Sequence, residues 1–371
     1  MVLLVVIVVL LGLFYVWLIL FYLKGWRNLQ EFEVVSNKTS TTISVVVAAR
    51  NEADNIENLL EDLANQSFLQ SRFEVIIVDD HSDDDTFQIA SNFTLSNLKV
   101  LKLESGIGKK AALHSGISDA TNELIVTTDA DCRVGEKWLE TLAAFYEKKR
   151  AKVIASPVVF NDGNGLLHQF QMLDFLSLMG ITAACIQNNF PNMVNGANLA
   201  YERQAYFEVQ GFEGVDHIPT GDDIFLTLKL HHLYPGSVHF LKANDAIIST
   251  KTQPSWASFF SQRIRWISKS RHFQDKKITT VLVMAWFFNA AIFGSIFFGI
   301  TFSKEWLFMG LTLLTIKLGL DGLFVFPVAR YFNRQKVLWL FLPIELLHVL
   351  YVIIIGLVAN FLPYNWKGRS Y

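Results

Sequence analysis

Two aspartates separated by one residue, Asp129 and Asp131, have the type and spacing needed to hold a metal ion. Mg²⁺ and Mn²⁺ prefer oxygen ligands and commonly share their coordination with substrate phosphates. A cation at this position would stabilise the negative charge that develops on a diphosphate leaving group. An acidic pair after a strand can equally serve as a turn or a helix cap, so this motif alone leaves both interpretations open.

A second acidic pair, Asp79 and Asp80, also follows an apolar run. A carboxylate at a strand end can accept hydrogen bonds from a base or a ribose hydroxyl, as acidic residues do in dinucleotide-binding folds. Further along the chain, the sequence from Gly106 to Lys110 (GIGKK) combines flexible backbone with cations, of which Lys109 could lie near a diphosphate. The spacing of a Walker motif is absent, and a solvated basic turn is the alternative interpretation.

Asp222 and Asp223 stand at the start of a helical stretch that runs from Ile224 to His231. A positioned carboxylate can take the proton that a hydroxyl loses when it attacks an electrophilic carbon, which would make one of them a general base. Acidic residues at a helix start are also stabilised by the helix dipole, so a capping role is the competing interpretation.

The segment Gln262–Trp266 (QRIRW) places Arg263, Arg265 and an indole within five residues. Two guanidinium groups could clamp a diphosphate, and Trp266 could stack on a sugar or a base. Aromatic and aliphatic side chains alternate with basic ones over residues 256–267, as they do in helices that lie on a membrane surface. The two interpretations are compatible.

The elements that must position these residues form an alternating pattern of strands and helices between residues 36 and 253. This alternation predicts an α/β fold with a parallel sheet. Ligands of open parallel sheets bind at the carboxyl ends of the strands, which is where the acidic residues stand. The expected strands are Ile43–Ala49, Phe73–Val78, Leu98–Leu103 and Leu124–Thr128, and the expected helices are Asn55–Ala64, Thr86–Asn92 and Lys109–Ser118.

Outside this middle region the chain is strongly apolar. Of its 371 residues 51% are hydrophobic and only 18% are charged, against about 25% charged in soluble proteins. The first apolar run, Val2–Leu23, is long enough to cross a bilayer. It has neither a basic start nor a small-residue cleavage site, which favours an uncleaved anchor over a signal peptide. The net charge of −2 argues against a nucleic-acid binder.

Three further spans are expected, at Ile278–Phe302, Trp306–Val328 and Leu338–Leu362. Lys24 and Arg27 follow the first span, and the positive-inside rule therefore places the middle region in the cytosol. The same rule is violated after the last span, so its orientation stays open. Lys317 and Asp321 lie one helical turn apart inside a span, where they could pair with each other.

Taken in chain order, these motifs resemble the family-two glycosyltransferases, whose members include cellulose and hyaluronan synthases and ceramide glucosyltransferase. The family pattern has an early strand that ends in an Asn-Glu pair, here Asn51-Glu52, and later the acidic motifs and Gln-x-x-Arg-Trp described above. The resemblance covers Ser44 to Arg271 and implies a GT-A (Rossmann-like) fold. It implies donor contacts from Ala49, Arg50, Asn51, Glu52, Asp79, Asp80, Lys109, Asp129, Gln262, Arg265 and Trp266.

The resemblance also implies the roles of the remaining site residues. Asp131 and Asp129 would bind Mg²⁺ or Mn²⁺, and Asp223, with Asp222 beside it, would be the base of an inverting displacement. Asn195, Gly196 and Asn198, expected before a helix, resemble an acceptor-side loop. The motif Gly-Asp-Asp departs from the Thr-Glu-Asp of processive synthases and is closer to members that glycosylate lipids.

We therefore expect a multi-pass protein of the cell membrane that moves a sugar from a nucleotide-sugar donor, of the UDP type, to a lipid or glycan acceptor. A processive polysaccharide synthase and a non-catalytic membrane scaffold are the alternatives. The expected parts of the chain are an anchor (1–24), a cytosolic catalytic domain (36–253), an interfacial helix (254–275) and a C-terminal transmembrane region (276–371).

Overall fold

The computed structural model of the chain describes residues 2–35, 39–190, 193–273 and 275–359, and the backbone of residues 365–366 and 369–370. The chain forms two compact units. Unit 1 comprises Met1–Arg27, Gly163–Ala184 and Thr252–Tyr371, and unit 2 comprises Asn28–Asp162 and Cys185–Lys251. Since the chain passes between the units four times, each unit is assembled from segments that lie far apart in the sequence.

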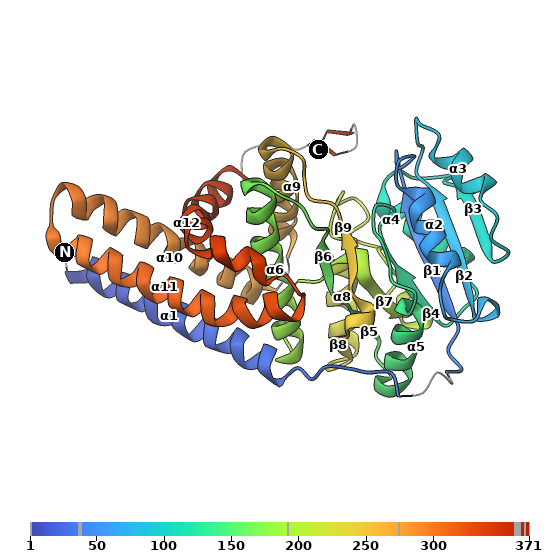
Figure 1. The fold of residues 1–371 in the computed structure, drawn as a ribbon, viewed down its shortest axis with the longest axis horizontal. Helices are drawn as coiled ribbons and strands as arrows, with labels where there is room; N and C mark the ends of the chain where they lie inside the picture. Colours follow the sequence, from blue (N-terminus) through green and yellow to red (C-terminus); the bar gives the residue numbers. More distant parts are fainter. Residues whose placement is uncertain are drawn as a thin grey trace. The chain divides into compact units, whose positions relative to one another are not determined.

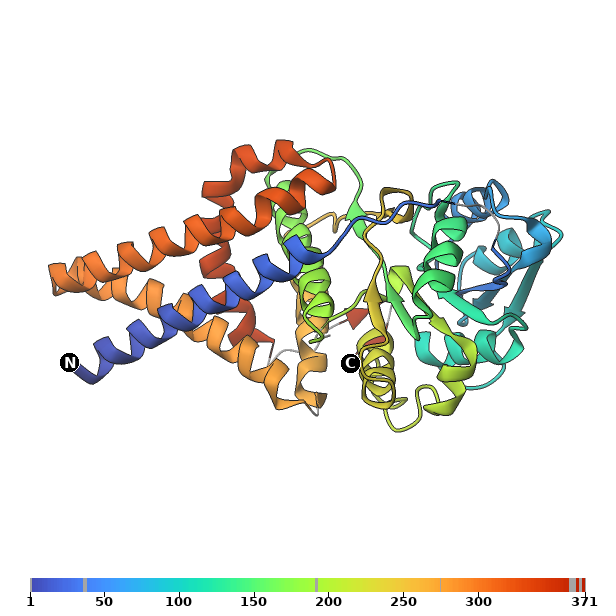
Figure 2. The same cartoon turned by 90° about the horizontal axis from the view of Figure 1, so that it is seen from below.

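Unit 2 is built on a mixed seven-stranded sheet with the order β3-β2-β1-β4-β7-β5-β8 (Figures 1 and 2). The first four strands are parallel, whereas β7 runs antiparallel to both of its neighbours. A separate parallel pair is formed by β6 and β9. The strands are β1 (Ile43–Ala49), β2 (Phe73–Asp79), β3 (Leu98–Lys102), β4 (Leu124–Thr127), β5 (Val153–Ala155), β6 (Val158–Phe160), β7 (Leu199–Glu202), β8 (Val238–Phe240) and β9 (Ile248–Thr250).

The central strands form because their β-branched side chains are buried on both faces of the sheet. Val45, Val46 and Val47 of β1 have no exposed surface, and continuous apolar runs of this kind are typical of parallel strands covered by helices. The helices of unit 2 are α2 (Ile56–Ala64), α3 (Thr86–Asn92), α4 (Lys109–Asp119), α5 (Trp138–Lys149), α7 (Arg203–Glu208) and α8 (Asp222–Leu233), with 3₁₀ turns η1 (Gln70–Arg72), η2 (Gly196–Asn198) and η3 (Asn244–Ala246).

Helix α4 approaches the sheet closely because it carries a glycine where it crosses the strands. A Cβ atom at Gly116 would lie 2.6 Å from Cγ1 of Val46 and 3.1 Å from Cγ2 of Val78. Only glycine fits at these distances. The close packing fixes α4 against β1 and β2, and it brings the first residues of α4 to the carboxyl ends of these strands.

Unit 1 consists of helices, most of which are long and apolar. They are α1 (Val2–Asn28), α6 (Leu166–Gln187, of which the residues up to Ala184 belong to this unit), α9 (Trp256–Ser268), α10 (Lys276–Thr301), α11 (Lys304–Tyr331) and α12 (Phe341–Val358), with η4 (Lys269–His272) and η5 (Gln335–Leu340). A short antiparallel pair, β10 (Asn365–Trp366) and β11 (Arg369–Ser370), follows. Within the described part of the chain, five helical segments are long and apolar enough to cross a membrane: Val2–Asn28, Leu166–Gln187, Lys276–Thr301, Lys304–Tyr331 and Gln335–Val358.

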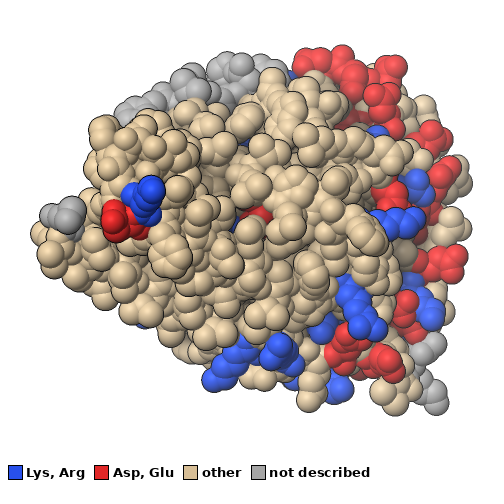
Figure 3. Space-filling model, turned by 60° about the vertical axis from the view of Figure 1, so that its left-hand side comes forward, with Lys and Arg blue, Asp and Glu red and all other residues tan. Residues whose placement is uncertain are grey.

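Four of these segments agree with the expected spans. The fifth, α6, lies inside the region expected to be a catalytic domain, but its contacts assign it to unit 1. The last expected span extends to Leu362, and its final residues lie outside the described part of the chain. Many apolar side chains of these helices are exposed. Figure 3 shows a broad area with few charged side chains at the centre and left of the view, whereas charged side chains gather along its right-hand side and lower edge. This composition suits a lipid environment.

The predicted pair Lys317–Asp321 is confirmed and belongs to a larger buried group. The ammonium of Lys317 contacts the carboxylates of Asp321 and, at 2.6 Å, of Glu345 on α12. The hydroxyl of Tyr15 on α1 donates to Oδ1 of Asp321 at 2.6 Å. Charged groups are costly in lipid unless they are paired, so these contacts fix how α1, α11 and α12 pack together.

Candidate functional site

The acidic residues of unit 2 meet at one edge of the sheet. Strands β1, β2 and β4 are parallel neighbours, with Ala49 opposite Asp79 and Val46 opposite Thr127. Their carboxyl ends therefore lie side by side, as expected for the binding edge of an α/β sheet. The backbone carbonyl of Ala49 accepts a hydrogen bond from the amide of Asp80 at 2.8 Å, which ties the first two strand ends together.

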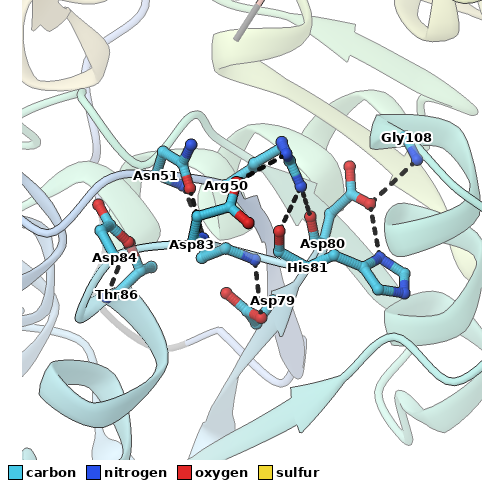
Figure 4. A network of polar contacts seen from close by, with 10 residues as sticks. Arg50, Asn51, Asp79, Asp80, His81, Asp83, Asp84, Thr86 and Gly108 are labelled. Carbon is cyan, nitrogen blue, oxygen red and sulfur yellow. Dashed lines mark hydrogen bonds and ion pairs between the residues drawn. The ribbon is translucent and has the colours of Figure 1, made fainter. Parts of the chain in front are cut away.

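A polar network connects the loops that follow β1 and β2 (Figure 4). The guanidinium of Arg50 donates to the carbonyl oxygens of Asp80 and His81 and pairs with the carboxylate of Asp83 at 3.1 Å. The amide of Asp83 donates to Oδ1 of Asn51 at 2.9 Å. Asn51 has a positive φ of 51°, a conformation that asparagine tolerates better than most residues. These contacts hold the two loops together.

Asp79 and Asp80 are both buried, but their carboxylates differ in their partners. Oδ1 of Asp80 accepts a hydrogen bond from the amide of Gly108 at 3.1 Å and lies 3.2 Å from Nδ1 of His81. Gly108 has a φ of 97°, in the left-handed region that favours glycine. Oδ1 of Asp79 has no hydrogen-bond partner among the described residues, although the atom is fully buried. A buried acceptor without a partner is costly, and it suits a ligand that donates a hydrogen bond.

Glu52 is held in place by local contacts. Its carboxylate accepts a hydrogen bond from the side chain of Asn55 at 2.6 Å, and its amide donates to the hydroxyl of Thr86 at 2.7 Å. The carboxylate of Asp84 accepts from both the amide and the hydroxyl of Thr86. Burial raises the pKa of Asp84, but the bonds from Thr86 and from a further backbone amide outweigh it, so the pKa lies below its ordinary value. The start of α3 is thereby joined to the loops that follow β1 and β2.

Lys109, the first residue of α4, connects two of the predicted acidic motifs. Its ammonium lies 2.6 Å from Oδ1 of Asp129 and 3.4 Å from Oδ2 of Asp222. Burial acts to lower the pKa of Lys109, but the charges of Asp129, Asp222 and Asp223 outweigh it and raise the pKa above its ordinary value. The ammonium therefore stays charged and neutralises part of a strongly acidic site.

The loop before β7 completes this arrangement. A Cβ atom at Gly196 would lie 3.1 Å from Oδ2 of Asp222, 3.3 Å from Cβ of Asp223 and 3.5 Å from Nζ of Lys109. The amide of Gly196 donates to Oδ2 of Asp223 at 3.3 Å, and Oδ1 of Asp223 accepts from the amide of Ile224 at 2.7 Å. The structure thus brings Lys109, Asp129, Asp222, Asp223 and Gly196 together from four separate segments of unit 2.

The turn that carries Asp129 and Asp131 is well supported. The amide of Cys132 donates to the carbonyl of Asp129 at 3.1 Å, and Arg133 pairs with Asp62 of α2 through two bonds of 2.6 and 2.7 Å. Burial, followed by the charges of Asp129 and Asp131, raises the pKa of the Cys132 thiol well above its ordinary value. The negative charges of both carboxylates therefore act on the Cys132 thiol, which places the two side chains near each other.

The chemistry of this donor set fits a hard cation that shares its coordination with a substrate. Among the described residues, no three or more His, Cys, Asp or Glu side chains gather closely enough to form a complete metal site. Asp129 and Asp131 supply carboxylate oxygens, and the side chain of Asp129 is 40% exposed and can reach a ligand. Mg²⁺ is commonly held in this way, by one or two carboxylates together with water and substrate phosphates.

Asn195 and Asn198 have different surroundings. Oδ1 of Asn195 accepts from the amide of Ala197 at 3.0 Å and begins the turn η2. Asn198 has no exposed surface; its amide group donates to the carbonyls of Pro157 and Ala246 and accepts from the indole of Trp138. These hydrogen bonds support the fold of unit 2. Asn198 could contact an acceptor substrate only if they were broken. The loop is followed by strand β7 and then by the short helix α7, not directly by the expected helix.

The Gln-x-x-Arg-Trp residues lie on α9, which belongs to unit 1. Gln262, Arg265 and Trp266 are half-buried, and their expected contacts with a donor stay predictions. Arg263, which was expected to share a diphosphate clamp with Arg265, is buried. Its guanidinium pairs with Asp174 of α6 at 2.7 Å, so it is committed to a contact within its own unit.

The sequence interpretation missed Asp174 and Glu345 as members of buried ion pairs. Each is an isolated carboxylate in an otherwise apolar helix, and this pattern is itself a signal, because such charges are rarely left unpaired. Their partners could not be identified from the sequence, since Arg263 is 89 residues from Asp174 and Lys317 is 28 residues from Glu345.

Comparisons with known proteins find similarity to glycosyltransferases. The model of Glycosyl transferase family 2 matches residues 44–206. The chain is 30% identical over 189 residues to a glycosyltransferase, AglE, of Haloferax volcanii, which covers 50% of this chain and 60% of that protein. It is 25% identical over 232 residues to the poly-beta-1,6-N-acetyl-D-glucosamine synthase of Staphylococcus epidermidis, covering 60% of this chain and 53% of the relative. The chain thus spans little more than half the length of these relatives.

Among solved structures, the fold resembles that of a mannosyltransferase from Pyrobaculum calidifontis in complex with GDP-Man and Mn²⁺. The TM-score is 0.61 at 18% identity, and the match covers 96% of this chain and 98% of the other. At this level of identity the likeness establishes the fold alone.

Proposed function

Residues 44–206 form a Glycosyl transferase family 2 domain with a GT-A fold, and from this premise we propose that the protein transfers a sugar from a nucleotide-sugar donor to a lipid or lipid-linked acceptor. The donor we propose is of the UDP type, and the transfer takes place at the cytosolic face of the membrane. One observation carries the proposal: Lys109 joins Asp129 of the Asp-x-Asp turn to Asp222 of the Gly-Asp-Asp motif. These contacts support the proposal that a metal ligand, its counter-charge and a candidate base share one site.

The reaction we propose is a direct displacement. The hydroxyl oxygen of the acceptor forms a bond to the anomeric carbon, the bond from that carbon to the diphosphate oxygen breaks, and the nucleoside diphosphate leaves. Asp223 accepts the hydroxyl proton, since a carboxylate held near the attacking group can act as a general base. Its orientation is set by the amides of Gly196 and Ile224.

The remaining residues would bind and orient the donor. A divalent cation held by Asp129 and Asp131 would supply Lewis-acid stabilisation of the diphosphate charge. Asp79, whose buried Oδ1 has no partner among the described residues, would accept a hydrogen bond from the nucleoside. Lys109 would place a positive charge beside the leaving group, because its raised pKa keeps it protonated.

A lipid acceptor is favoured by the way in which the catalytic unit is tethered. The chain leaves unit 2 and enters the apolar helices of unit 1 at several points, and five segments of that unit are long enough to cross a membrane. Lys24 and Arg27 at the end of α1 support a cytosolic location of unit 2. The motif Gly221-Asp222-Asp223 is the residue-level support for a lipid-glycosylating enzyme over a polymer synthase.

A donor screen tests the proposal. The full-length protein, reconstituted in lipid nanodiscs, is incubated with a panel of nucleotide sugars, with Mg²⁺, with Mn²⁺ or with chelator, and released nucleoside diphosphate is measured. We expect metal-dependent release that extracted lipids stimulate and that yields one sugar per lipid. A ladder of products without added lipid would favour the processive synthase. Absence of release from every donor, with lipids present, would favour the scaffold.

A further inference from the structure

Helix α9 carries a buried arginine between the residues of the Gln-x-x-Arg-Trp motif. The helix starts at a capping box, in which Ser255 and Ser258 exchange side-chain and backbone hydrogen bonds. Its buried positions are Phe259, Arg263 and Ile264. Arg263 is only 2% exposed, and a buried guanidinium must be compensated by a counter-charge and by hydrogen bonds.

The counter-charge comes from Asp174 on α6. Nε and a terminal nitrogen of Arg263 donate to Oδ2 of Asp174 at 3.1 and 2.7 Å. The other oxygen of Asp174 lies 3.5 Å from Nε2 of His348 on α12. Two bonds from one planar group to one oxygen fix the plane of the guanidinium, which a lysine ammonium could not do.

The rest of the guanidinium acts on the motif itself. Its other terminal nitrogen donates to Oε1 of Gln262 at 2.9 Å. A guanidinium can only donate, so the atom that faces it must be the amide oxygen, and the amide nitrogen of Gln262 becomes the outward donor. The same guanidinium lies 4.0 Å from the ring centre of Trp266, at cation–π distance, and this contact orients the indole.

We infer that Arg263, held by Asp174, is a positioning residue that orients Gln262 and Trp266 for contact with the donor or the acceptor. The inference rests on the proposed function, since it is that function which gives Gln262 and Trp266 a substrate to contact. Arg263 itself contacts no substrate in this assignment. Its guanidinium donates to Asp174 and Gln262. Its face lies over the rings of Trp266 and, at 4.7 Å from the ring centre, of Phe259.

A kinetic double-mutant cycle tests the link to Gln262. Arg263→Lys, Gln262→Ala and the double variant are compared with the wild type in nanodiscs. A lost hydrogen bond to a charged group corresponds to about tenfold or more in kcat/KM, and we expect such a loss in each single variant. We expect the double variant to fall well short of the product of the two losses, because Arg263 acts through Gln262. A double variant whose loss in kcat/KM equals the product of the two single losses would overturn the inference.

A spectroscopic experiment tests the link to Trp266 independently of any activity. The protein is labelled with 5-fluorotryptophan, and the ¹⁹F resonance of Trp266 is assigned with Trp266→Phe. We expect this resonance to shift in Arg263→Lys and in Asp174→Asn. Tyr15→Phe is the control, because it removes a buried hydrogen bond of unit 1 that is not part of α9, and it should leave the resonance in place. An unchanged Trp266 resonance in Arg263→Lys would overturn the inference.

The two experiments separate the inference from the function on which it rests. A wild-type protein that releases no nucleoside diphosphate contradicts the proposed function, and the ¹⁹F experiment then decides whether Arg263 orients Trp266. An active wild type whose Arg263→Lys variant keeps full kcat/KM contradicts the positioning role and leaves the function standing.

Discussion

Replacing Asn198 by alanine should destabilise unit 2 severely, although the residue lies in a loop beside the candidate site. The side chain makes three buried hydrogen bonds, with the indole of Trp138 at 3.0 Å and with the carbonyls of Pro157 at 2.8 Å and Ala246 at 2.9 Å. Alanine removes all three bonds. The carbonyl of Pro157 keeps a second bond, which it accepts from the amide of Ile248 at 3.2 Å, whereas the indole of Trp138 and the carbonyl of Ala246 lose Asn198 as their partner. Each lost bond costs about 1 kcal/mol and each orphaned group about 1–3 kcal/mol where no water replaces the amide.

We expect a net loss of about 3–5 kcal/mol, since the cavity left by the amide can admit a water that recovers part of the bonding. For a unit of about 200 residues this corresponds to a fall in Tm of about 10 °C. The thiols of Cys132 and Cys185 are buried and belong to unit 2, so a thiol-reactive fluorescent dye reports the unfolding of this unit.

Asn195→Ala is the matched control in the same loop. It removes one hydrogen bond, to the amide of Ala197, at a half-buried position, and should lower the Tm by only about 2–4 °C. An Asn198→Ala protein that unfolds within 4 °C of the wild type, or no earlier than Asn195→Ala, would refute the structural role assigned to Asn198.

Two further substitutions test the centre of the site. Gly196→Ala should lower kcat about tenfold with little change in Tm. The added methyl group would lie 3.1 Å from Oδ2 of Asp222 and 3.3 Å from Cβ of Asp223, and it would displace these side chains. Unchanged kinetics would contradict this expectation and show that the two side chains have room to move. Lys109→Met should weaken donor binding about tenfold, because it removes a positive charge beside the diphosphate. The same variant should bind Mn²⁺ more strongly in the absence of donor, because the ammonium that competes with the metal for Asp129 is gone. Mn²⁺ binding is measured by electron paramagnetic resonance. A Lys109→Met protein that binds both the donor and Mn²⁺ more weakly would contradict the expected gain in Mn²⁺ affinity.

The sequence predicts the first half of the sheet well because the central strands are buried on both faces. Their β-branched runs and the helical spacing of Ile56, Leu59, Leu60 and Leu63 give strands β1 to β4 and helix α2 to within one or two residues. Strands β5 to β9 were not predicted. They contain only three or four residues each, and a pattern of that length cannot be distinguished from an extended loop.

The candidate site could be predicted motif by motif but not as an assembly. Each acidic pair stands at a strand end or a helix start, where sequence patterns can find it. The bridge made by Lys109 between Asp129 and Asp222 depends on how α4 packs on the sheet, which no local pattern encodes. The burial of Arg263 and of Asn198 is likewise decided by tertiary contacts, with partners 89 and 60 residues away.

The most direct test of the proposed transferase is to compare donor binding with sugar transfer in Asp223→Asn. Donor affinity is measured by calorimetry, and transfer by nucleoside diphosphate release, both in nanodiscs with the donor that the screen identifies. We predict a donor Kd within about threefold of the wild type and a turnover reduced at least about 100-fold, because the amide cannot accept the hydroxyl proton. Turnover near the wild-type value would contradict the assignment of Asp223 as the base.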